Sequence, residues 1–422
     1  MGGYKMILSL IYKVVTAVLA PVIYQKIRFS AKGNAYGERI NELLGNIPEK
    51  DYHSPVWFHT VSVGETMGAL PLIKKFHERW PDKHIVVTTS TPTGAALYKN
   101  LSYVEHHYAP LDSPIAVKKF TEKLKPSALI IMETELWPNL LQELESQDVP
   151  VYLINARLSE RSASRYAMLK STFNTLIGDK LKMLICQTVD DRNNFEKLGI
   201  PPNKLSISGS LKFDIDVNPE KIALGKKFKK LFPEKQILCV ASTHQGEDEI
   251  ALDIFKEVKN SIPNLLLLLI PRHPERFESV FNLAKAAGFN TARKTDPEIS
   301  QNTDVIIGNT MGEMPIYLSA STLVLMAGSL VDIGGHNPLE AIAVNTPVIS
   351  GPHVRNFKKI FHDLVNNQAS IVAENSELPH IIETLLNNEQ DIEKLKRNAQ
   401  TVLNSNRGAI DKTLNLLEEC GK

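Results

Sequence analysis

The stretch LVLMAGSLVDIGGHNPLEAIAVNTPVISGPHVRNF, residues 323–357, decides the fold. Its apolar start, residues 323–326, is typical of a strand buried in a parallel sheet, and Gly328 ends that strand. Asn337 can cap a helix, and Pro338 suits the first helical position. The pattern therefore predicts a strand, a glycine loop, a helix beginning at Pro338 and a further strand.

The loop ahead of this helix has the properties of an anion site. Gly334 and Gly335 allow backbone amides to approach a ligand closely, and Glu340 stands three residues after the expected cap. A helix start presents unpaired N–H groups and partial positive charge, so it can hold a phosphate without a metal. The alternative is an ordinary turn between a strand and a helix. The local pattern favours an anion or nucleotide site.

Length and composition narrow the class of protein. A chain of 422 residues is too long for one ordinary core, which favours two α/β domains of roughly 150 to 200 residues each. The 48 Lys and Arg residues balance 47 Asp and Glu residues, so a general nucleic-acid partner is not indicated. Three cysteines without a CxxC pattern predict neither a disulfide framework nor a metal site, and they fit a reducing, cytosolic setting.

The N-terminal segment is almost wholly apolar. Residues 6–24 (MILSLIYKVVTAVLAPVIY) are interrupted only by Lys13 and Pro21, and their length is just sufficient to span a bilayer. A spanning helix and a helix lying on the membrane are both possible, and either is favoured over a cleaved signal peptide. The basic residues that follow are Lys26, Arg28, Lys32 and Arg39. Such clusters prefer the cytoplasmic face.

Polar side chains follow the strands expected in the first half of the chain. Glu65 lies at the turn between a strand at 56–61 and the next helix, where the binding crevice of an open α/β sheet is found. The helix dipole would favour its ionised form, which a general base needs. The local pattern alone, however, favours a Glu that merely suits the start of its helix.

Two further groups of polar residues each have two interpretations that the sequence supports equally. Glu133 and Glu135 follow the apolar run 128–132, and they either orient an acceptor sugar or a base, or complement a helix dipole. Arg157 and Arg161 follow the next expected strand. They either receive acceptor phosphates or form surface salt bridges.

The alternation of strands and helices restarts after a charged segment. Residues 214–235 read as a link that includes a helix, and strands are expected at 237–240 and 265–270. The second of these strands runs into Arg272 and His273, which therefore face the same crevice.

Motifs along nearly the whole chain now resemble one family. They are SVGE (62–65), METELWPN (132–139), NARLSERS (155–162), GSLKFD (209–214), ASTHxGE (241–247), PRHPERF (271–277), TMGE (310–313), GGHNPLE (334–340) and GPHxxNF (351–357). In kind and order they resemble bacterial 3-deoxy-D-manno-octulosonic acid (Kdo) transferases, which build the inner core of lipopolysaccharide. Ser210, where that family often has Asn, and Asp332 with Ile333 are small departures.

The resemblance implies an α/β fold of the glycosyltransferase-B type, with two Rossmann-like domains facing a cleft. The implied order is a membrane anchor helix (1–30), an acceptor-binding domain (31–215), a linker (216–235) and a CMP-Kdo-binding domain (236–422). The implied reaction moves Kdo from CMP-Kdo to the lipid A precursor, lipid IVA, with inversion and without a metal or other cofactor. The implied location is the cytoplasmic face of the bacterial inner membrane, with no nucleic-acid partner.

The resemblance also implies roles for individual residues. Glu65 is the expected base, Glu133 the second catalytic residue, and Arg157 an acceptor-binding residue. The expected donor-binding residues are Ser242, Arg272, His273, Met311, Gly312, Glu313, Gly335, Asn337 and Glu340.

Two alternatives from other classes were weighed. A soluble UDP-sugar epimerase of the same fold would need neither the apolar N-terminus nor METELWPN. A catalytically silent membrane scaffold would have no chemical use for Glu65, Arg272 and GGHNPLE together.

Overall fold

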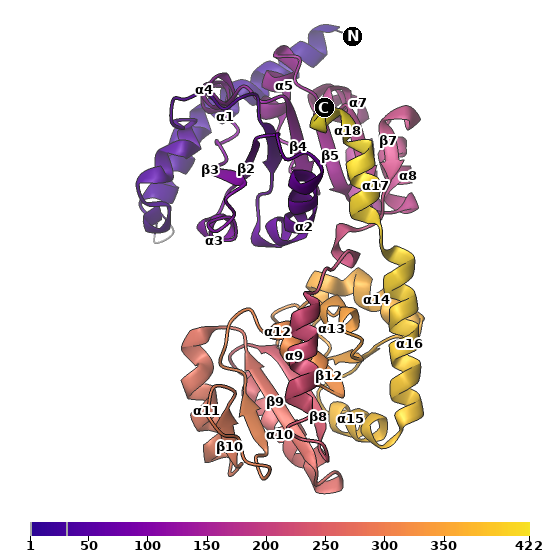
Figure 1. The fold of residues 1–422 in the computed structure, drawn as a ribbon. Coiled ribbons are helices and arrows are strands. Elements are labelled where there is room, and N and C mark those ends of the chain that lie inside the picture. Colours follow the sequence, from indigo (N-terminus) through magenta and orange to yellow (C-terminus); the bar gives the residue numbers. More distant parts are fainter. Residues whose placement is uncertain (1, 31–32) are drawn as a thin grey trace. The chain divides into compact units, whose positions relative to one another are not determined.

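A computed structural model describes residues 2–30 and 33–422 (Figure 1). The chain forms two compact units. The first runs to Asp214 and includes the returning segment Arg407–Lys422, and the second is Ile215–Asn406. Lys32, one of the basic residues noted in the sequence, lies outside the described residues.

The first unit contains a seven-stranded sheet in the order β3-β2-β1-β4-β5-β6-β7, in which neighbouring strands pair in parallel. The strands are β1 (Val56–His59), β2 (Ile85–Thr89), β3 (Val104–Tyr108), β4 (Ala128–Met132), β5 (Val151–Ala156), β6 (Met183–Cys186) and β7 (Leu205–Ile207). The helices are α1 (Gly2–Arg28), α2 (Val63–Arg79), α3 (Pro92–Ala96), α4 (Pro114–Leu124), α5 (Pro138–Ser146), α6 (Glu160–Ala167), α7 (Lys170–Leu176), α8 (Val189–Lys197), α17 (Ala409–Leu416) and α18 (Glu418–Gly421).

The adjacent strands β1 and β4 of this sheet are largely apolar on both faces. Trp57 and Leu129 belong to a core cluster on one face, whereas Phe58 and Ile130 belong to a cluster on the other. A parallel sheet covered on both faces requires this continuous apolarity, which is why the strands lack polar alternation.

The last residues of the chain return to the first unit. Ile410 and Leu414 of α17 join the core cluster that contains Phe76 of α2. The Asp214 carboxylate accepts hydrogen bonds of 2.6 Å from the backbone N–H groups of Gly408 and Ile410. The sequence analysis placed residues 236–422 in one domain and so did not assign the last residues to the first unit. The sequence of a charged amphipathic helix does not indicate which core its apolar side packs against.

The second unit also contains a seven-stranded sheet with parallel pairing, in the order β10-β11-β9-β8-β12-β13-β14. It differs from the first sheet in that β11 lies between β10 and β9. The strands are β8 (Gln236–Thr243), β9 (Leu265–Pro271), β10 (Thr291–Arg293), β11 (Val305–Ile307), β12 (Leu323–Met326), β13 (Val348–Ser350) and β14 (Ile371–Val372). The helices are α9 (Pro219–Lys229), α10 (Glu247–Ser261), α11 (Phe277–Ala286), α12 (Met314–Ala320), α13 (Leu339–Ala343), α14 (Lys358–Asn366), α15 (Leu378–Asn387) and α16 (Glu389–Asn406).

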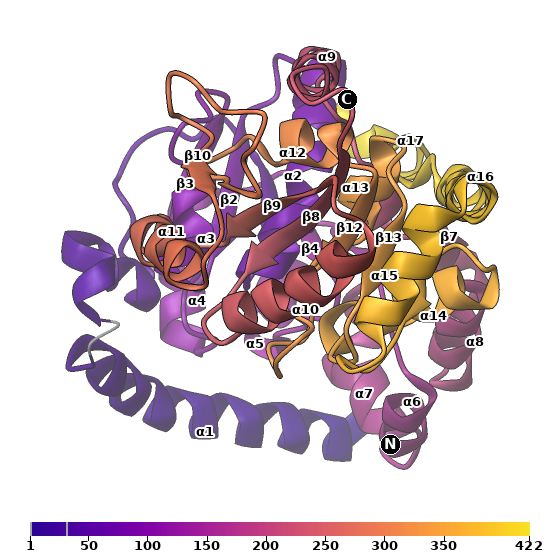
Figure 2. The same cartoon turned by 90° about the horizontal axis from the view of Figure 1, so that it is seen from below.

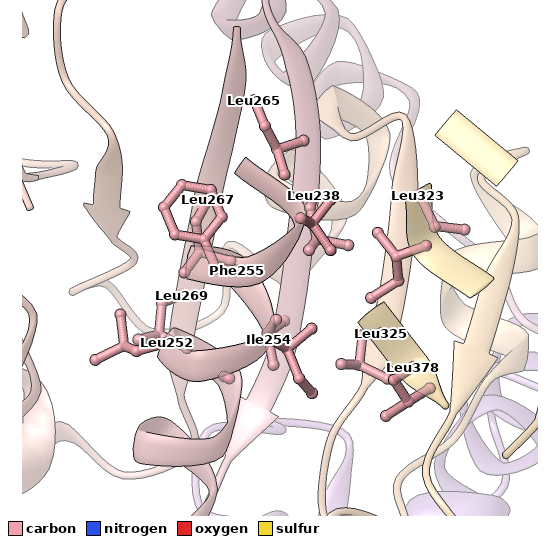
Figure 3. Packing of buried hydrophobic residues seen from close by; sticks show 14 of the residues in the cluster. Leu238, Leu252, Ile254, Phe255, Leu265, Leu267, Leu269, Leu323, Leu325 and Leu378 are labelled. Carbon is pink, nitrogen blue, oxygen red and sulfur yellow. The ribbon is translucent and has the colours of Figure 1, made fainter. Parts of the chain in front are cut away.

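Leucines dominate the core of the second unit. Figure 3 shows Phe255 of α10 beside Leu238 of β8 and Leu267 of β9, all of them buried in one cluster. Helix α9, in the segment expected to be a linker, packs closely on α12. The contact leaves no room for a side chain at Gly225, since its Cβ would lie 2.4 Å from the Ile316 carbonyl oxygen. Residues 219–229 are therefore part of this unit.

Helix α1 lies along the first unit, against α4 and α7 (Figure 2). The Ser9 hydroxyl donates to Gln142 and the Tyr12 hydroxyl to Asp112 on this side. The exposed large apolar residues of the helix are Ile7, Leu10, Ile11, Val14, Val15, Val18, Leu19, Val22 and Ile23. Residues Ser9–Arg28 have a mean hydropathy of 1.4, enough by length and composition to cross a membrane, a test that signal sequences also pass.

Asp214→Ala is expected to cost the first unit about 1–2 kcal/mol in free energy of unfolding, because the amides of Gly408 and Ile410 lose their acceptor. All three tryptophans lie in this unit, so tryptophan fluorescence during urea unfolding reports on it. Asp216→Ala, at an exposed side chain, is the matched control. Equal unfolding midpoints for the two variants would contradict the assignment.

Candidate active site

The two sheets share one topological feature. In the first sheet the strand order reverses between the first and fourth strands, β1 and β4, and in the second between the first and fifth strands, β8 and β12. Ligands of open α/β sheets bind beyond the carboxyl ends of the strands at such a point. The loops that follow these four strands are therefore the places to look for a site.

In the first unit, Glu65 lies just beyond β1, in the first turn of α2. Its carboxylate accepts hydrogen bonds from the Val61 amide (2.8 Å) and the Ser62 hydroxyl (2.9 Å), while the Glu65 amide donates to Ser62. This arrangement is a variant of the capping box in which the Val61 amide stands in place of the N-cap amide, and it fixes the side chain at the end of the strand. The side chain is buried, with 9% of the residue exposed.

Burial raises the pKa of Glu65 above its ordinary value, and the negative charges of Glu135 and Glu133 raise it further. The hydrogen bonds from Val61 and Ser62 act in the opposite direction but are outweighed. The sequence predicted that the helix start would favour the ionised form, so the direction of the net shift is a correction. A carboxylate with a raised pKa is a stronger proton acceptor once it is ionised.

Glu133 follows β4, the other strand at this point of reversal. Its backbone is left-handed (φ 62°), as is that of Asn155 (φ 50°), whose side-chain amide donates to Glu133 at 3.4 Å. Lys212 lies 3.8 Å from the same carboxylate oxygen. Residues other than glycine rarely adopt this left-handed backbone conformation, and those that do are concentrated at functional sites. Arg157 lies one strand further, beyond β5, and is exposed.

In the second unit, Glu247 joins the loops that follow β8 and β12. It is fully buried, and its carboxylate accepts hydrogen bonds from the amides of His244 (2.8 Å), Gly328 (2.8 Å) and Leu330 (2.9 Å). Sequence analysis placed Glu247 only on a helix. Its role depends on residues about eighty positions further along the chain, which no local pattern reveals.

The predicted basic residues lie at the same edge. Arg272 and His273 follow β9 and are exposed, and the Arg272 amide donates to the Thr243 carbonyl at 2.9 Å. Ser242, at the end of β8, has a left-handed backbone (φ 65°). Arg276 is held by an ion pair with Asp248. The structure thus gathers the expected Ser242, Arg272 and His273 around β8 and β9.

The glycine loop after β12 is tightly folded. Gly334 and Gly335 have φ values of 110° and 79°, and the Gly335 amide donates to the Gly328 carbonyl at 2.6 Å. The Asn337 side chain accepts from the Leu339 amide at 3.2 Å. The N-cap position is occupied by Pro338, which makes no side-chain cap, so the predicted cap at Asn337 and helix start at Pro338 lie one residue early. The helix begins at Leu339 and has only five residues, because Asn345 adopts a left-handed backbone soon after.

Two acids at this edge have opposite pKa shifts. Burial raises the pKa of Glu340, and Arg272 partly offsets this. Burial alone would raise the pKa of Glu313, but hydrogen bonds from Lys294 and Thr310 lower it. The turn that carries Met311, Gly312 and Glu313 follows β11, two strands away from β8, and so lies further along the edge.

Two histidines that the sequence analysis did not select meet between these loops. Nε2 of His244 lies 2.9 Å from Nε2 of His336, and their rings stack with centroids 5.1 Å apart. His273 contacts His244 edge to face at 5.4 Å. Both histidines stand inside quoted motifs, THxGE and GGHNPLE, which was the available signal.

Two α/β units with parallel sheets and polar strand ends define the glycosyltransferase-B type of fold. A family model described as "Glycosyl transferases group 1" matches residues 249–402. A second, described as "3-Deoxy-D-manno-octulosonic-acid transferase (kdotransferase)", matches residues 38–215. A 3-deoxy-D-manno-octulosonic acid transferase from Haemophilus influenzae is 38% identical over 397 residues, 92% of this chain and 93% of the relative. The chain belongs to the Kdo transferase family and is a glycosyltransferase.

Other relatives agree with this assignment. The Bordetella pertussis enzyme of the same name is 33% identical and covers 76% of both chains. A solved UDP-GlcNAc 2-epimerase from Neisseria meningitidis has a TM-score of 0.51 and 13% identity, covering 86% of this chain and all of its own. At that identity the likeness concerns the fold alone, so the epimerase alternative gains no support from it.

Glu247→Gln is expected to destabilise the second unit by about 2–3 kcal/mol, because an amide offers one acceptor atom where three N–H groups need two. Amide hydrogen exchange at Gly328 and Leu330 should accelerate about tenfold or more. Glu249→Gln, at an exposed position in the same turn of α10, should leave these rates unchanged. Unchanged rates in Glu247→Gln would show that the carboxylate does not hold the loops.

Proposed function

We propose that the protein transfers Kdo from CMP-Kdo to a hydroxyl of the lipid A precursor, lipid IVA, with inversion at the anomeric carbon. The observation that carries the proposal is the placement of Glu65 and Glu133 beyond β1 and β4, with the Arg272 and His273 pair beyond β9 in the other unit. An acid at one sheet edge and cations at the other suit a base and an anionic donor, respectively.

Glu65 acts as the general base. It removes the proton from the acceptor hydroxyl as the oxygen forms its bond to the anomeric carbon, and the bond from that carbon to the CMP phosphate oxygen breaks on the opposite face. One displacement of this kind inverts the configuration. Burial and two neighbouring acids raise the pKa of Glu65, which makes its carboxylate the stronger base.

The second unit binds the donor. Negative charge grows on the departing phosphate, so Arg272, His273 and the loop amides near Gly335 and Asn337 stabilise the transition state electrostatically. Ser242 and Glu340 complete this binding surface. Met311, Gly312 and Glu313, further along the edge, contact the nucleotide.

The first unit binds the acceptor at the membrane. Glu133 positions the attacking hydroxyl, and Arg157 receives an acceptor phosphate. The exposed apolar side of α1 anchors the enzyme at the cytoplasmic face of the inner membrane, where basic residues such as Lys26 and Arg28 meet anionic lipid.

The direct experiment incubates the purified protein with CMP-Kdo and tetraacyl lipid A precursor, follows CMP release, and determines the mass of the lipid product. We expect a gain of one or more Kdo units, and its loss in Glu65→Gln, a change expected to retain the fold and CMP-Kdo binding. Near-normal turnover by that variant would remove Glu65 as the base. CMP binding without product would remove only the acceptor assignment.

Glu133→Gln tests the electrostatic coupling of the two acids. The negative charge of Glu133 raises the pKa of Glu65, so a neutral side chain should lower that pKa. Because the base must be ionised, the acid limb of the pH profile of kcat/KM should move to lower pH, whatever happens to the maximal rate. Glu160→Gln, at an exposed position on α6, should leave the profile in place. An unmoved acid limb in Glu133→Gln would contradict the coupling.

A further inference from the structure

The pair formed by His244 and His336 stands at the point where the strand order of the second sheet reverses. His244 follows β8 and His336 lies in the loop after β12, the two strands that flank this point. Their Nε2 atoms are 2.9 Å apart, which is a hydrogen-bond distance. A hydrogen bond between two imidazole nitrogens needs one nitrogen with a proton and one without, so the contact holds a single proton.

The fold fixes both rings in this contact. A side chain at Gly328 would place its Cβ 2.8 Å from Cδ2 of His336, so only glycine leaves room for the ring. The Glu247 carboxylate binds the amides of both His244 and Gly328. The two loops are therefore held together through a buried acid, and the two rings meet between them.

The charges around the pair disfavour a second proton. Arg272, from the loop after β9, acts on both rings as a cation, Arg276 beside α11 acts on His244, and His273 is a further basic side chain beside them. Of the nearby acids, Glu247 is occupied by amides, Glu340 interacts with Arg272, and Asp332 pairs with Arg355 from the loop after β13 and lies near His353.

The result is a neutral pair near pH 7. Burial lowers the pKa of His336 to about 4, and His244, Arg272 and His273 add to this, while a hydrogen bond with the Ser242 backbone opposes it. Burial and the neighbouring cations also lower the pKa of His244, although Glu247 acts in the other direction. The site therefore carries the positive charge of its arginines but not of these two rings.

An anionic ligand reverses this balance. CMP-Kdo carries a phosphodiester and a sugar carboxylate, and a negative charge near an imidazole favours its protonated form. One additional proton on either ring would turn the neutral pair into a cation that donates charge-assisted hydrogen bonds. We propose that the His244–His336 pair is an anion receptor of the donor site, which takes up one proton from solvent when CMP-Kdo binds. The proposal rests on CMP-Kdo being the donor.

Calorimetry of CMP-Kdo binding to the full chain carrying Glu65→Gln, without acceptor, tests the pair. Titrations at pH 7 in buffers of different ionisation enthalpy give the number of protons taken up, which should approach one per donor bound. Between pH 7 and pH 8 the affinity should fall by up to about tenfold. His336→Asn and, separately, His244→Asn should bind more weakly and lose the uptake. His362→Asn, an exposed histidine on α14, should retain both.

The same titration with CMP identifies the anion. The phosphate of CMP itself titrates near pH 6, so the measure is the difference in uptake between the protein with and without His336→Asn. A difference with CMP assigns the pair to the phosphate, and a difference with CMP-Kdo only assigns it to the carboxylate; both support the proposal.

Binding of CMP-Kdo with the same proton uptake in the protein and in both histidine variants overturns the role of the pair and leaves the donor assignment intact. Failure of the folded protein to bind CMP-Kdo overturns the proposed function and the pair together. Melting temperatures of the variants separate weak binding from misfolding, and His244→Asn provides the test if His336→Asn does not fold.

Discussion

Parallel strand pairing, with the strand order reversing beside the first strand of each sheet, is the constraint on which the rest of this structure depends. Parallel pairing sends the carboxyl ends of the strands to one edge of each sheet, and the reversal separates two adjacent loops there. In the first unit these loops carry Glu65 and Glu133. In the second they carry His244 and the glycine loop, beside Arg272. The same architecture therefore supports an acidic site in one unit and a cationic site in the other.

Two buried glutamates have a similar local arrangement but different roles. Glu65 and Glu247 each stand in the first turn of a helix and reach back to backbone amides. Three amides occupy the oxygens of Glu247, which is fully buried and holds two loops. Glu65 has one amide and one hydroxyl, and other acids nearby. A carboxylate whose oxygens are fully occupied by hydrogen-bond donors has a structural role, whereas a carboxylate with fewer donors remains able to accept a proton.

Local patterns predicted the parts of the structure that depend on neighbours in sequence. Apolar runs identified the central strands, and the spacing of Gly335, Asn337 and Pro338 identified the loop and, to within one residue, the start of its helix. Tertiary contacts were out of reach: Glu247 binds Gly328 across 81 positions, and the histidine pair spans 92. The direction of the Glu65 pKa shift was misjudged for the same reason, since burial and the charges of Glu135 and Glu133 outweigh the hydrogen bonds from Val61 and Ser62.

The return of α17 to the first unit has a consequence for biosynthesis. The Asp214 carboxylate can accept its hydrogen bond from the Gly408 amide only after Gly408, 194 positions later in the chain, has been synthesised. At roughly 5–20 residues per second, a ribosome needs about ten to forty seconds to make the intervening residues. Until then the apolar side of α2 that receives Ile410 and Leu414 lacks its cover. The unit made first is therefore completed last, and chaperones have an uncovered surface to bind throughout that interval.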